Sequence, residues 1–217
     1  MTKNIPDVFH AFLVQNANFS GEYEIPILQH EVVIPNKVIL FSDCIKSKDY
    51  DSWVIFYEHD KKFVRIWNNP RKYTNILKRF NGVISPDFSL YRSMPLCMQI
   101  WNTYRSRALA HFWQTNGIKV IPNIRFSDER SYKFCFNGIP KNSVIAVGTH
   151  GCIKNKKDRI FFKNGLDETV KVINPSTIIV YGPTPDDLFL NYKNQGINII
   201  NFLSKTELYY QSKKAVM

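Results

Sequence analysis

The sequence predicts an α/β protein with a mostly parallel sheet flanked by helices. Short runs rich in Val and Ile alternate along the chain with longer amphipathic stretches. Continuous apolar runs of this length are typical of strands buried on both faces, and such alternation is typical of parallel sheets. Seven strand candidates are one fewer than a complete eight-stranded barrel requires. We therefore expect an open doubly wound sheet or an incomplete barrel.

The strand candidates are spread over the chain from residue 37 onward. They are Lys37–Asp43, Ser52–Asp60, Gly82–Asp87, Ile118–Phe126, Ser143–His150, Ser176–Gly182 and Ile197–Leu203. We expect the third, fourth and fifth of these to be the central strands because their apolar character is continuous. Val120 and Ile145 should then be buried.

Four helical stretches lie between the strands. Asn69–Phe80 has Pro70 near its start and Gly82 shortly after its end, and Met94–Gly117 is opened by Pro95 and closed by its glycine. A short stretch begins at the acidic Asp128, and a further one covers 186–196. The basic run Lys154–Arg159 is interpreted as a loop, which is either solvated or in contact with a phosphate backbone.

The longest helix has two distinct faces. Apolar and small residues recur at spacings of three and four, which predicts a core stripe consisting of Cys97, Ile100, Trp101, Tyr104, Ala108 and Phe112. Another face carries Gln99, Asn102 and Arg105 at steps of three. The planar guanidinium of Arg105 suits phosphate or carboxylate, so Asn102 and Arg105 are candidate ligand-binding residues. The alternative is a solvated polar face with extended arginines.

The domain organisation follows from length and composition. With 217 residues, 44% of them hydrophobic, we expect one α/β domain over 36–217, preceded by an N-terminal arm or edge hairpin over 1–35 that covers the sheet. No apolar run is long enough for a membrane span, and the N-terminus does not resemble a secretory signal. A cytoplasmic setting is therefore expected.

The four cysteines do not form a metal-binding or disulfide pattern. None stands at CxxC spacing, so we expect neither a structural metal nor a disulfide. Cys97 and Cys135 lie in apolar surroundings and are interpreted as small core residues.

The chain carries a formal net charge of +11. A strong positive field attracts nucleic acid, nucleotides or acidic protein surfaces. The alternative is a compositional bias of the genome, since the chain is also rich in Asn, Ile and Lys.

Polar side chains stand at the carboxyl ends of two neighbouring strand candidates. Asp87 ends the first, and Asn123 and Arg125 share one side of the next. Parallel-sheet proteins place their sites at this edge. Asp87 is a candidate general base, metal ligand or ribose-hydroxyl acceptor, and Asn123 and Arg125 are candidate ligand-binding residues. The alternatives are that Asp87 caps the following turn or pairs with Arg125 as structure.

The next strand candidate ends in Thr149 and His150, between two glycines. Glycines permit a tight turn or close approach of a ligand to the backbone, and histidine transfers protons near neutral pH. Thr149 is a candidate ligand-binding residue and His150 a candidate catalytic one, although a lone histidine is more often structural.

Familiar nucleotide and metal motifs are absent from the sequence. There is no GxxxxGK[ST] loop, GxGxxG fingerprint, HExxH or GxSxG. Nucleotide hydrolysis by the P-loop route is thereby excluded, and the sequence identifies no cofactor or metal.

The motifs SPDFS, QIWNTYRSRA, PNIRF, FCFNGIP and GTHG occur in this order between about Phe80 and Tyr192. In these motifs the chain resembles an uncharacterised family carried by phages, prophages and mobile elements, catalogued as a domain of unknown function. The resemblance implies a mobile-element origin and a cytoplasmic setting in the bacterial host. It implies no activity and no catalytic residue.

Three functions remain open, and the third is disfavoured. The first is a protein that acts on nucleic acid or a nucleotide, with Asp87 and His150 as catalytic residues and arginines as phosphate ligands. The second is a basic binding protein that sequesters a nucleotide signal or inhibits a host defence or replication protein. The third is a DNA-binding control factor, which is disfavoured because no helix-turn-helix or zinc finger is recognisable.

Overall fold

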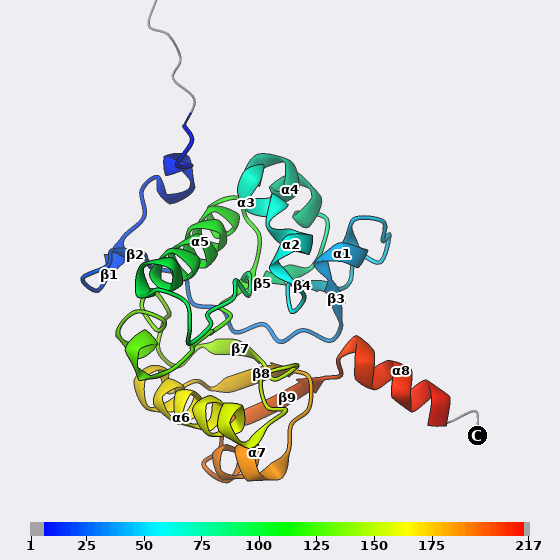
Figure 1. Cartoon of the computed structure of the whole chain (residues 1–217). Coiled ribbons are helices and arrows are strands. Elements are labelled where there is room, and N and C mark those ends of the chain that lie inside the picture. The colour runs from blue at the N-terminus through cyan, green and yellow to red at the C-terminus, as the bar shows by residue number, and fades with distance from the viewer. Residues whose placement is uncertain (1–6, 215–217) are drawn as a thin grey trace, which may run out of the picture.

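The computed structural model of the chain describes residues 7–214 (Figure 1). Its strands are β1 (Phe19–Ser20), β2 (Ile25–Pro26), β3 (Val38–Leu40), β4 (Trp53–Ile55), β5 (Gly82–Ile84), β6 (Val120–Ile121), β7 (Val144–Gly148), β8 (Thr177–Tyr181) and β9 (Asn198–Phe202). Its α-helices are α1 (Phe41–Cys44), α2 (Asp60–Phe63), α3 (Arg65–Asn68), α4 (Pro70–Leu77), α5 (Leu96–Thr115), α6 (Lys156–Ile173), α7 (Asp186–Asn194) and α8 (Lys205–Lys214). The 3-10 helices are η1 (Ala11–Val14) and η2 (Glu129–Lys133).

All seven predicted strands are present, and they run parallel. The first four pair in the order β3-β4-β5-β6 and the last three in the order β7-β8-β9. A parallel bridge between Asn123 and Ala146 connects the two sheets. Val120 and Ile145 are fully buried, as predicted, and β5, β6 and β7 are central in the combined order.

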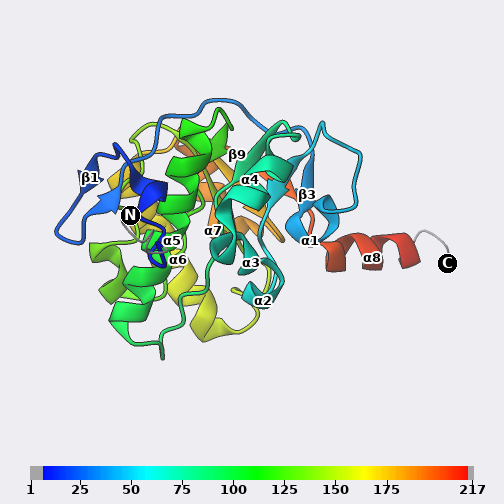
Figure 2. The same ribbon diagram turned by 90° about the horizontal axis from the view of Figure 1, so that it is seen from above.

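The strands enclose an apolar interior. One buried cluster draws side chains from all seven parallel strands, including Leu40, Trp53, Ile84, Ile121, Ala146 and Ile179, with Phe202 packed against it. Two further clusters lie between the strands and the surrounding helices. Figures 1 and 2 show the helices outside the strands. The chain therefore has the predicted α/β fold, in the form of an incomplete barrel: within residues 7–214 no strand pairing joins β3 to β9.

The long helix α5 buries the face that the sequence assigned to a polar row. Gln99, Asn102 and Ser106 are buried, whereas Cys97 and Trp101 of the expected core stripe are exposed. The buried polar groups bond to backbone carbonyls of neighbouring loops, so their burial leaves them satisfied. The predictions of a core Cys97 and of a buried apolar stripe over its whole length were therefore wrong.

The N-terminal segment packs against α5. The β2 strand contacts α5, Phe12 stacks edge-on against Phe112, and His111 Nδ1 lies 3.0 Å from the Leu13 carbonyl oxygen. The described part of the expected arm thus contributes a hairpin, β1 and β2, but the hairpin covers this helix rather than the sheet. Residues 1–6 of that arm and residues 215–217 lie outside the described residues.

The helix α6 begins inside the basic run that we had interpreted as a loop. Asn155 caps it by accepting a hydrogen bond from the Asp158 amide at 2.8 Å, and the helix continues to Ile173. Phe162, Leu166 and Ile173 bury one face of it at helical spacing. The loop interpretation was wrong because the charges of Lys154–Arg159 occupy the entry and first turn of an amphipathic helix.

Candidate functional site

Four polar side chains meet at the carboxyl ends of β4, β5 and β6. Asn123 is the centre: its Nδ2 donates to Asp87 Oδ1 at 2.8 Å, and its Oδ1 accepts from the Tyr57 hydroxyl at 2.8 Å. Arg125 Nη1 lies 3.5 Å from Asp87 Oδ2. The structure thus brings together Asp87, Asn123 and Arg125, and adds Tyr57, which the sequence did not single out.

The backbone of Asn123 is held from two sides. Ser85 Oγ accepts its amide hydrogen at 2.8 Å, and Arg107 Nη1 donates to its carbonyl at 3.0 Å. The same buried guanidinium donates to the carbonyls of Cys135 and Asn137. Burial lowers the pKa of Arg107 to about 10, and three backbone carbonyls surround its N–H groups. Arg107 therefore positions the end of β6.

Burial also sets the protonation behaviour of the cluster. Only 13% of the Asp87 side chain and 23% of the Arg125 side chain are exposed. Burial raises the pKa of Asp87, an effect that the Arg125 charge and the Asn123 hydrogen bond partly offset. The pKa of Arg125 is raised by the carboxylate of Asp87, so this guanidinium stays charged at every physiological pH. The pKa of Tyr57 is raised by burial, and its hydroxyl remains a donor.

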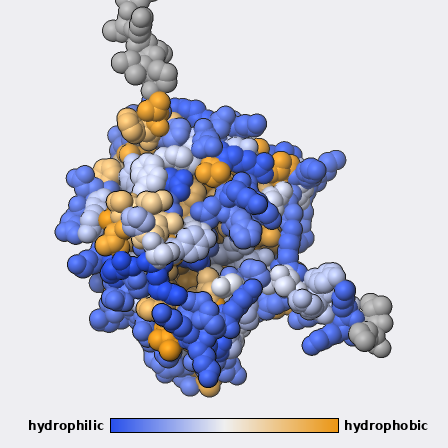
Figure 3. All heavy atoms as spheres, in the orientation of Figure 1, coloured by the Kyte–Doolittle hydropathy of each residue, from blue (hydrophilic) through white to orange (hydrophobic). Residues whose placement is uncertain are grey.

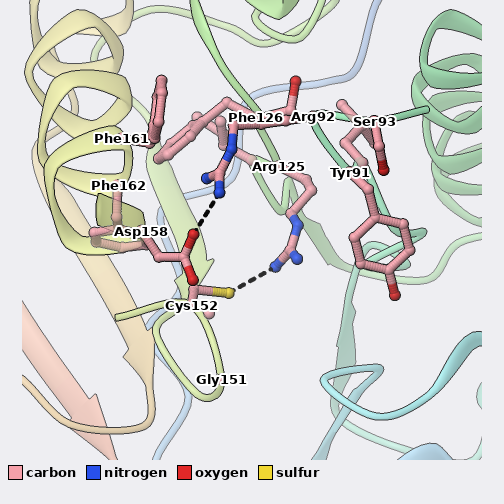
Figure 4. Close-up of a pocket in the computed structure, with 14 residues that line it drawn as sticks. Tyr91, Arg92, Ser93, Arg125, Phe126, Gly151, Cys152, Asp158, Phe161 and Phe162 are labelled. Carbon is pink, nitrogen blue, oxygen red and sulfur yellow. Dashed lines mark hydrogen bonds and ion pairs between the residues drawn. The ribbon is translucent and has the colours of Figure 1, made fainter. Parts of the chain in front are cut away.

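A cavity of about 460 Å³ opens beside this cluster (Figure 4). Arg125 lines it together with the loop that precedes α5, the end of β7 and the first turns of α6. Its lining includes Tyr91, Arg92, Phe126, Cys152, Asp158 and Phe161. This volume lies within the range of small-molecule pockets. Asp87 reaches the cavity through Arg125 and is not part of the lining.

An ion pair crosses the cavity and is called the clasp. Arg92 Nη2 lies 2.6 Å from Asp158 Oδ1, and the guanidinium carbon of Arg92 lies 4.3 Å from the centre of the Phe161 ring. Arg130 Nη2 donates to the backbone carbonyl of Arg92 at 2.7 Å and so helps to fix the backbone of the clasp residue. In Figure 4 the clasp stands beside Arg125, whose Nη1 lies 3.1 Å from Cys152 Sγ, and the Tyr91 ring points away from α6.

The end of β7 contributes a structural residue and an exposed one. The Thr149 hydroxyl is buried and donates to the Pro183 carbonyl at 2.8 Å, so it is committed within the fold. His150 is exposed, and its ring lies 6.5 Å from that of Tyr181, which itself stacks on Tyr57. His150 therefore lies at the same edge as the cluster, but neither residue lines the cavity.

The two candidates on α5 lie away from the cavity. Asn102 Nδ2 donates to the Ser89 carbonyl at 2.7 Å, which fixes the loop between β5 and α5. Arg105 bonds to Asn102 and stacks at 4.0 Å on the ring of Phe88. Both side chains are used in packing, because α5 turns its polar face toward this loop rather than toward the strand ends.

The sequence interpretation missed the cavity residues outside the strand ends. Arg92 and Tyr91 precede α5, and Asp158 and Phe161 belong to a helix that was interpreted as a loop. The available signal was Asn155 followed three residues later by Asp158, a helix-start pattern. Tyr57 lay inside the strand candidate Ser52–Asp60, and only the end of β4 at Ile55 shows that it follows the strand.

The described residues form neither a metal cluster nor a disulfide. Within residues 7–214 no three His, Cys, Asp or Glu side chains gather so as to hold a metal ion. All four cysteines, which lie in the described part, are free. Among the described helices, none has the length and apolar character needed to span a membrane.

Fold and site together define an α/β protein of parallel strands with a polar cluster and a cavity at the strand carboxyl ends. A family model described as a domain of unknown function, DUF4417, matches residues 17–203. The chain belongs to this family, which confirms the resemblance seen in its motifs.

Two phage proteins are similar to the chain. The Gene 1 protein of Mycobacterium phage L5 is 32% identical over 167 residues, which cover 75% of this chain and 72% of that protein. The Gene 1 protein of Mycobacterium phage D29 is 30% identical over 167 residues, covering 75% of this chain and 62% of that protein. No solved structure matches the chain. The chain is therefore phage-related.

Proposed function

We propose that the chain binds a nucleotide, or the end of a nucleic acid, in the cavity beside Arg125, and that it acts in the infected bacterial cell. The observation that carries the proposal is the state of the Arg125 guanidinium. Within residues 7–214 its hydrogen bonds all come from Nη1, which leaves the Nη2 donors uncommitted and the buried Nε without a partner. A guanidinium that is charged, held in position and left with free donors is suited to bind phosphate.

The rest of the cavity supports the same ligand class. The partly exposed Phe126 and Phe161 supply aromatic surface on which a base can stack. Asp158 lies in the first turn of α6, so the positive end of that helix dipole lies at the cavity. A ligand phosphate would compete with Asp158 for Arg92 and open the clasp. The net charge of +11 favours approach of an anion.

Binding without turnover is the form of this function that the geometry supports best. The criterion for a catalyst is that its polar groups converge in one concave site. Asp87 is bonded to Asn123 and Arg125 and does not line the cavity, and His150 is exposed at its rim. Sequestration of a nucleotide signal, or occlusion of a host protein by the basic surface, needs neither residue as an acid or base.

Catalysis is the second candidate, and one observation favours it. Burial raises the pKa of Asp87, which is the perturbation expected of a carboxyl that transfers protons nearer neutral pH. In that case Asp87→Asn abolishes turnover while preserving affinity, and His150→Ala tests whether the exposed histidine at the same edge takes part.

The test is calorimetric titration of the purified chain with mononucleotides and with short single-stranded oligonucleotides. Arg125→Ala should weaken binding by about 2 kcal/mol, roughly 30-fold, through loss of a charge-assisted contact. Arg92→Ala should also weaken binding at little cost in stability, since its pair with Asp158 is partly exposed. Arg79→Ala is the matched control, because Arg79 stacks on Tyr50 and does not line the cavity.

The outcomes separate the alternatives. Equal affinity of wild type, Arg92→Ala and Arg125→Ala for every nucleotide and oligonucleotide would reject the proposal. A lower melting temperature of Arg125→Ala with unchanged affinity would mean that the residue serves only to neutralise Asp87. Affinity that appears with oligonucleotides alone and falls steeply with salt would indicate an extended nucleic-acid contact. Mass spectrometry of molecules that co-purify with the chain would identify a tightly held ligand directly.

A further inference from the structure

The barrel has an open seam between β3 and β9. Within residues 7–214 each of these strands pairs on one side only, so each leaves one edge of backbone groups without a strand partner there. A groove of about 420 Å³ lies between them, with polar residues at its edges and an apolar lining of Val38, Leu40, Ile55, Phe202, Leu203 and, from the first turn of α8, Leu208. Val38 and Phe202 also pack against the interior cluster, so the groove exposes apolar interior surface. Open edges and exposed apolar grooves are normally covered in stable proteins.

The helix α8 starts at the rim of this groove and leaves the body of the molecule. Figures 1 and 2 both show it projecting from the end of β9, and Figure 3 shows it standing clear of the surface. It has no buried residue. Leu208, Tyr209 and Tyr210 are 52%, 54% and 60% exposed. A helix of ten residues is marginal in water without packing, so α8 needs a surface to lie on.

The start of α8 is fixed in this outward direction. Ser204 and Glu207 form a capping box, in which Ser204 N and Oγ donate to Glu207 Oε2 at 2.9 and 2.7 Å and Glu207 N donates to Ser204 Oγ at 3.3 Å. Lys205 pairs with Asp43 of α1, and its amide donates to the Tyr181 hydroxyl at 3.2 Å. The capping box moves with the helix, but folding α8 back onto its own groove would break the two Lys205 contacts.

We propose that the groove and α8 form a dimer interface, in which α8 of each copy covers the β3–β9 groove of a second copy of this chain. One chain supplies both the uncovered groove and the uncovered helix, which is the condition for a two-fold interface with reciprocal contacts. The family match ends at residue 203, so α8 lies beyond the segment shared with the family. The inference is independent of the cavity at Arg125 and of any ligand there.

The first measurement is the mass of the full-length chain by sedimentation equilibrium from about 1 to 200 μM, a range that spans weak to moderate affinities. We expect a monomer–dimer equilibrium. Leu208→Asp should raise the dimer Kd at least tenfold, because it places a charge in the apolar contact. Leu190→Asp is the control: Leu190 lies on α7 and is exposed to a similar extent, 48%, but is remote from the groove lining.

The second measurement is amide hydrogen exchange at low and high protein concentration. We expect amides of α8 and of the open edges of β3 and β9 to gain protection together as dimer forms. A monomer throughout the range would overturn the proposal, as would a dimer in which α8 exchanges as fast as in the monomer. Protection of the groove in the monomer would also overturn it, because a segment of the same chain would then be the cover.

Discussion

The two halves of the parallel sheet differ in how they are held together. The strands β7, β8 and β9 have five residues each and pair at five positions, whereas β4–β5 and β5–β6 pair at two positions each. In the first half, side chains replace the missing ladder, through Ser85 and Arg107 on the backbone of Asn123. The polar cluster thus occurs where regular pairing stops early, since extended backbone beyond the ladder can present polar side chains.

Substitution of Arg107 should have the largest effect on the stability of the β3–β6 half relative to the β7–β9 half. The change Arg107→Met removes the donor to the carbonyls of Asn123 and Cys135, which are buried. Each unsatisfied buried acceptor costs about 1–3 kcal/mol, so we expect the free energy of unfolding in urea to fall by about 3 kcal/mol or more. Hydrogen exchange should speed up in β3–β6 before it does in β7–β9.

The control is Arg105→Met, two residues earlier on the same helix. Arg105 bonds to Asn102 and otherwise stacks on aromatic rings, so its loss should cost clearly less than that of Arg107. Equal destabilisation by the two changes would contradict the role assigned to Arg107, as would uniform loss of protection over all seven strands.

The contact between the halves is tested by Gly148→Ala, with a smaller expected effect. A Cβ at Gly148 would lie 2.6 Å from Cδ1 of Tyr57, whose ring stacks at 5.2 Å on Tyr181. Overpacking of this kind costs about 1–3 kcal/mol, and a displaced Tyr57 would lose its bond to Asn123. If the clash with Tyr57 causes the destabilisation, the double change Gly148→Ala with Tyr57→Leu should lower the free energy of unfolding by less than the sum of the two single changes. Thermal unfolding of the three variants measures this difference.

The strands were predictable because their signal is local. Runs such as Ser176–Gly182 are apolar throughout, and burial on both faces leaves no other pattern. The same logic located Asp87, Asn123 and Arg125 at one edge, and the structure places them in contact. The hydrogen-bonding role of Tyr57 was not predictable in this way, since it depends on which strand lies beside β5.

The helices show where a local signal is insufficient. The apolar stripe of α5 predicted only part of its buried surface. Ala108 is buried, and Tyr104 and Phe112 pack against the core. The helix also packs against loop carbonyls, which attract Gln99, Asn102 and Ser106. The charges of Lys154–Arg159 concealed the start of α6, although Phe162, Leu166 and Ile173 follow it at helical spacing. Tertiary partners, which a single sequence does not display, decide the first case, whereas in the second the local signal of a capped amphipathic helix was present but obscured by the charges.

The buried carboxyl of Asp87 predicts a pH dependence of stability that originates in the β3–β6 half alone. Since burial raises its pKa, the folded chain binds this proton more tightly than the unfolded chain does. The stability contributed by Asp87 is then present at acid pH and declines as pH rises from about 4 through the raised pKa. The difference in unfolding free energy between wild type and Asp87→Asn isolates this carboxyl, and we expect it to fall between about pH 4 and 7. A rise would mean that the Arg125 charge outweighs burial.

The smallest effect is expected in the second half, at the start of α6. Asn155 accepts the Asp158 amide hydrogen at 2.8 Å, and Asp158 in turn holds Arg92 in the clasp. The change Asn155→Ala removes the cap and should cost about 1 kcal/mol of stability in urea unfolding, whereas Asn155→Ser, which preserves a capping oxygen, should cost less. Because the clasp is partly exposed, and because the proposed ligand would have to open it, loosening it should alter nucleotide affinity by no more than about threefold. A much larger loss of affinity in Asn155→Ala than in Arg92→Ala would show that the helix start itself, rather than the Arg92 side chain, holds the ligand.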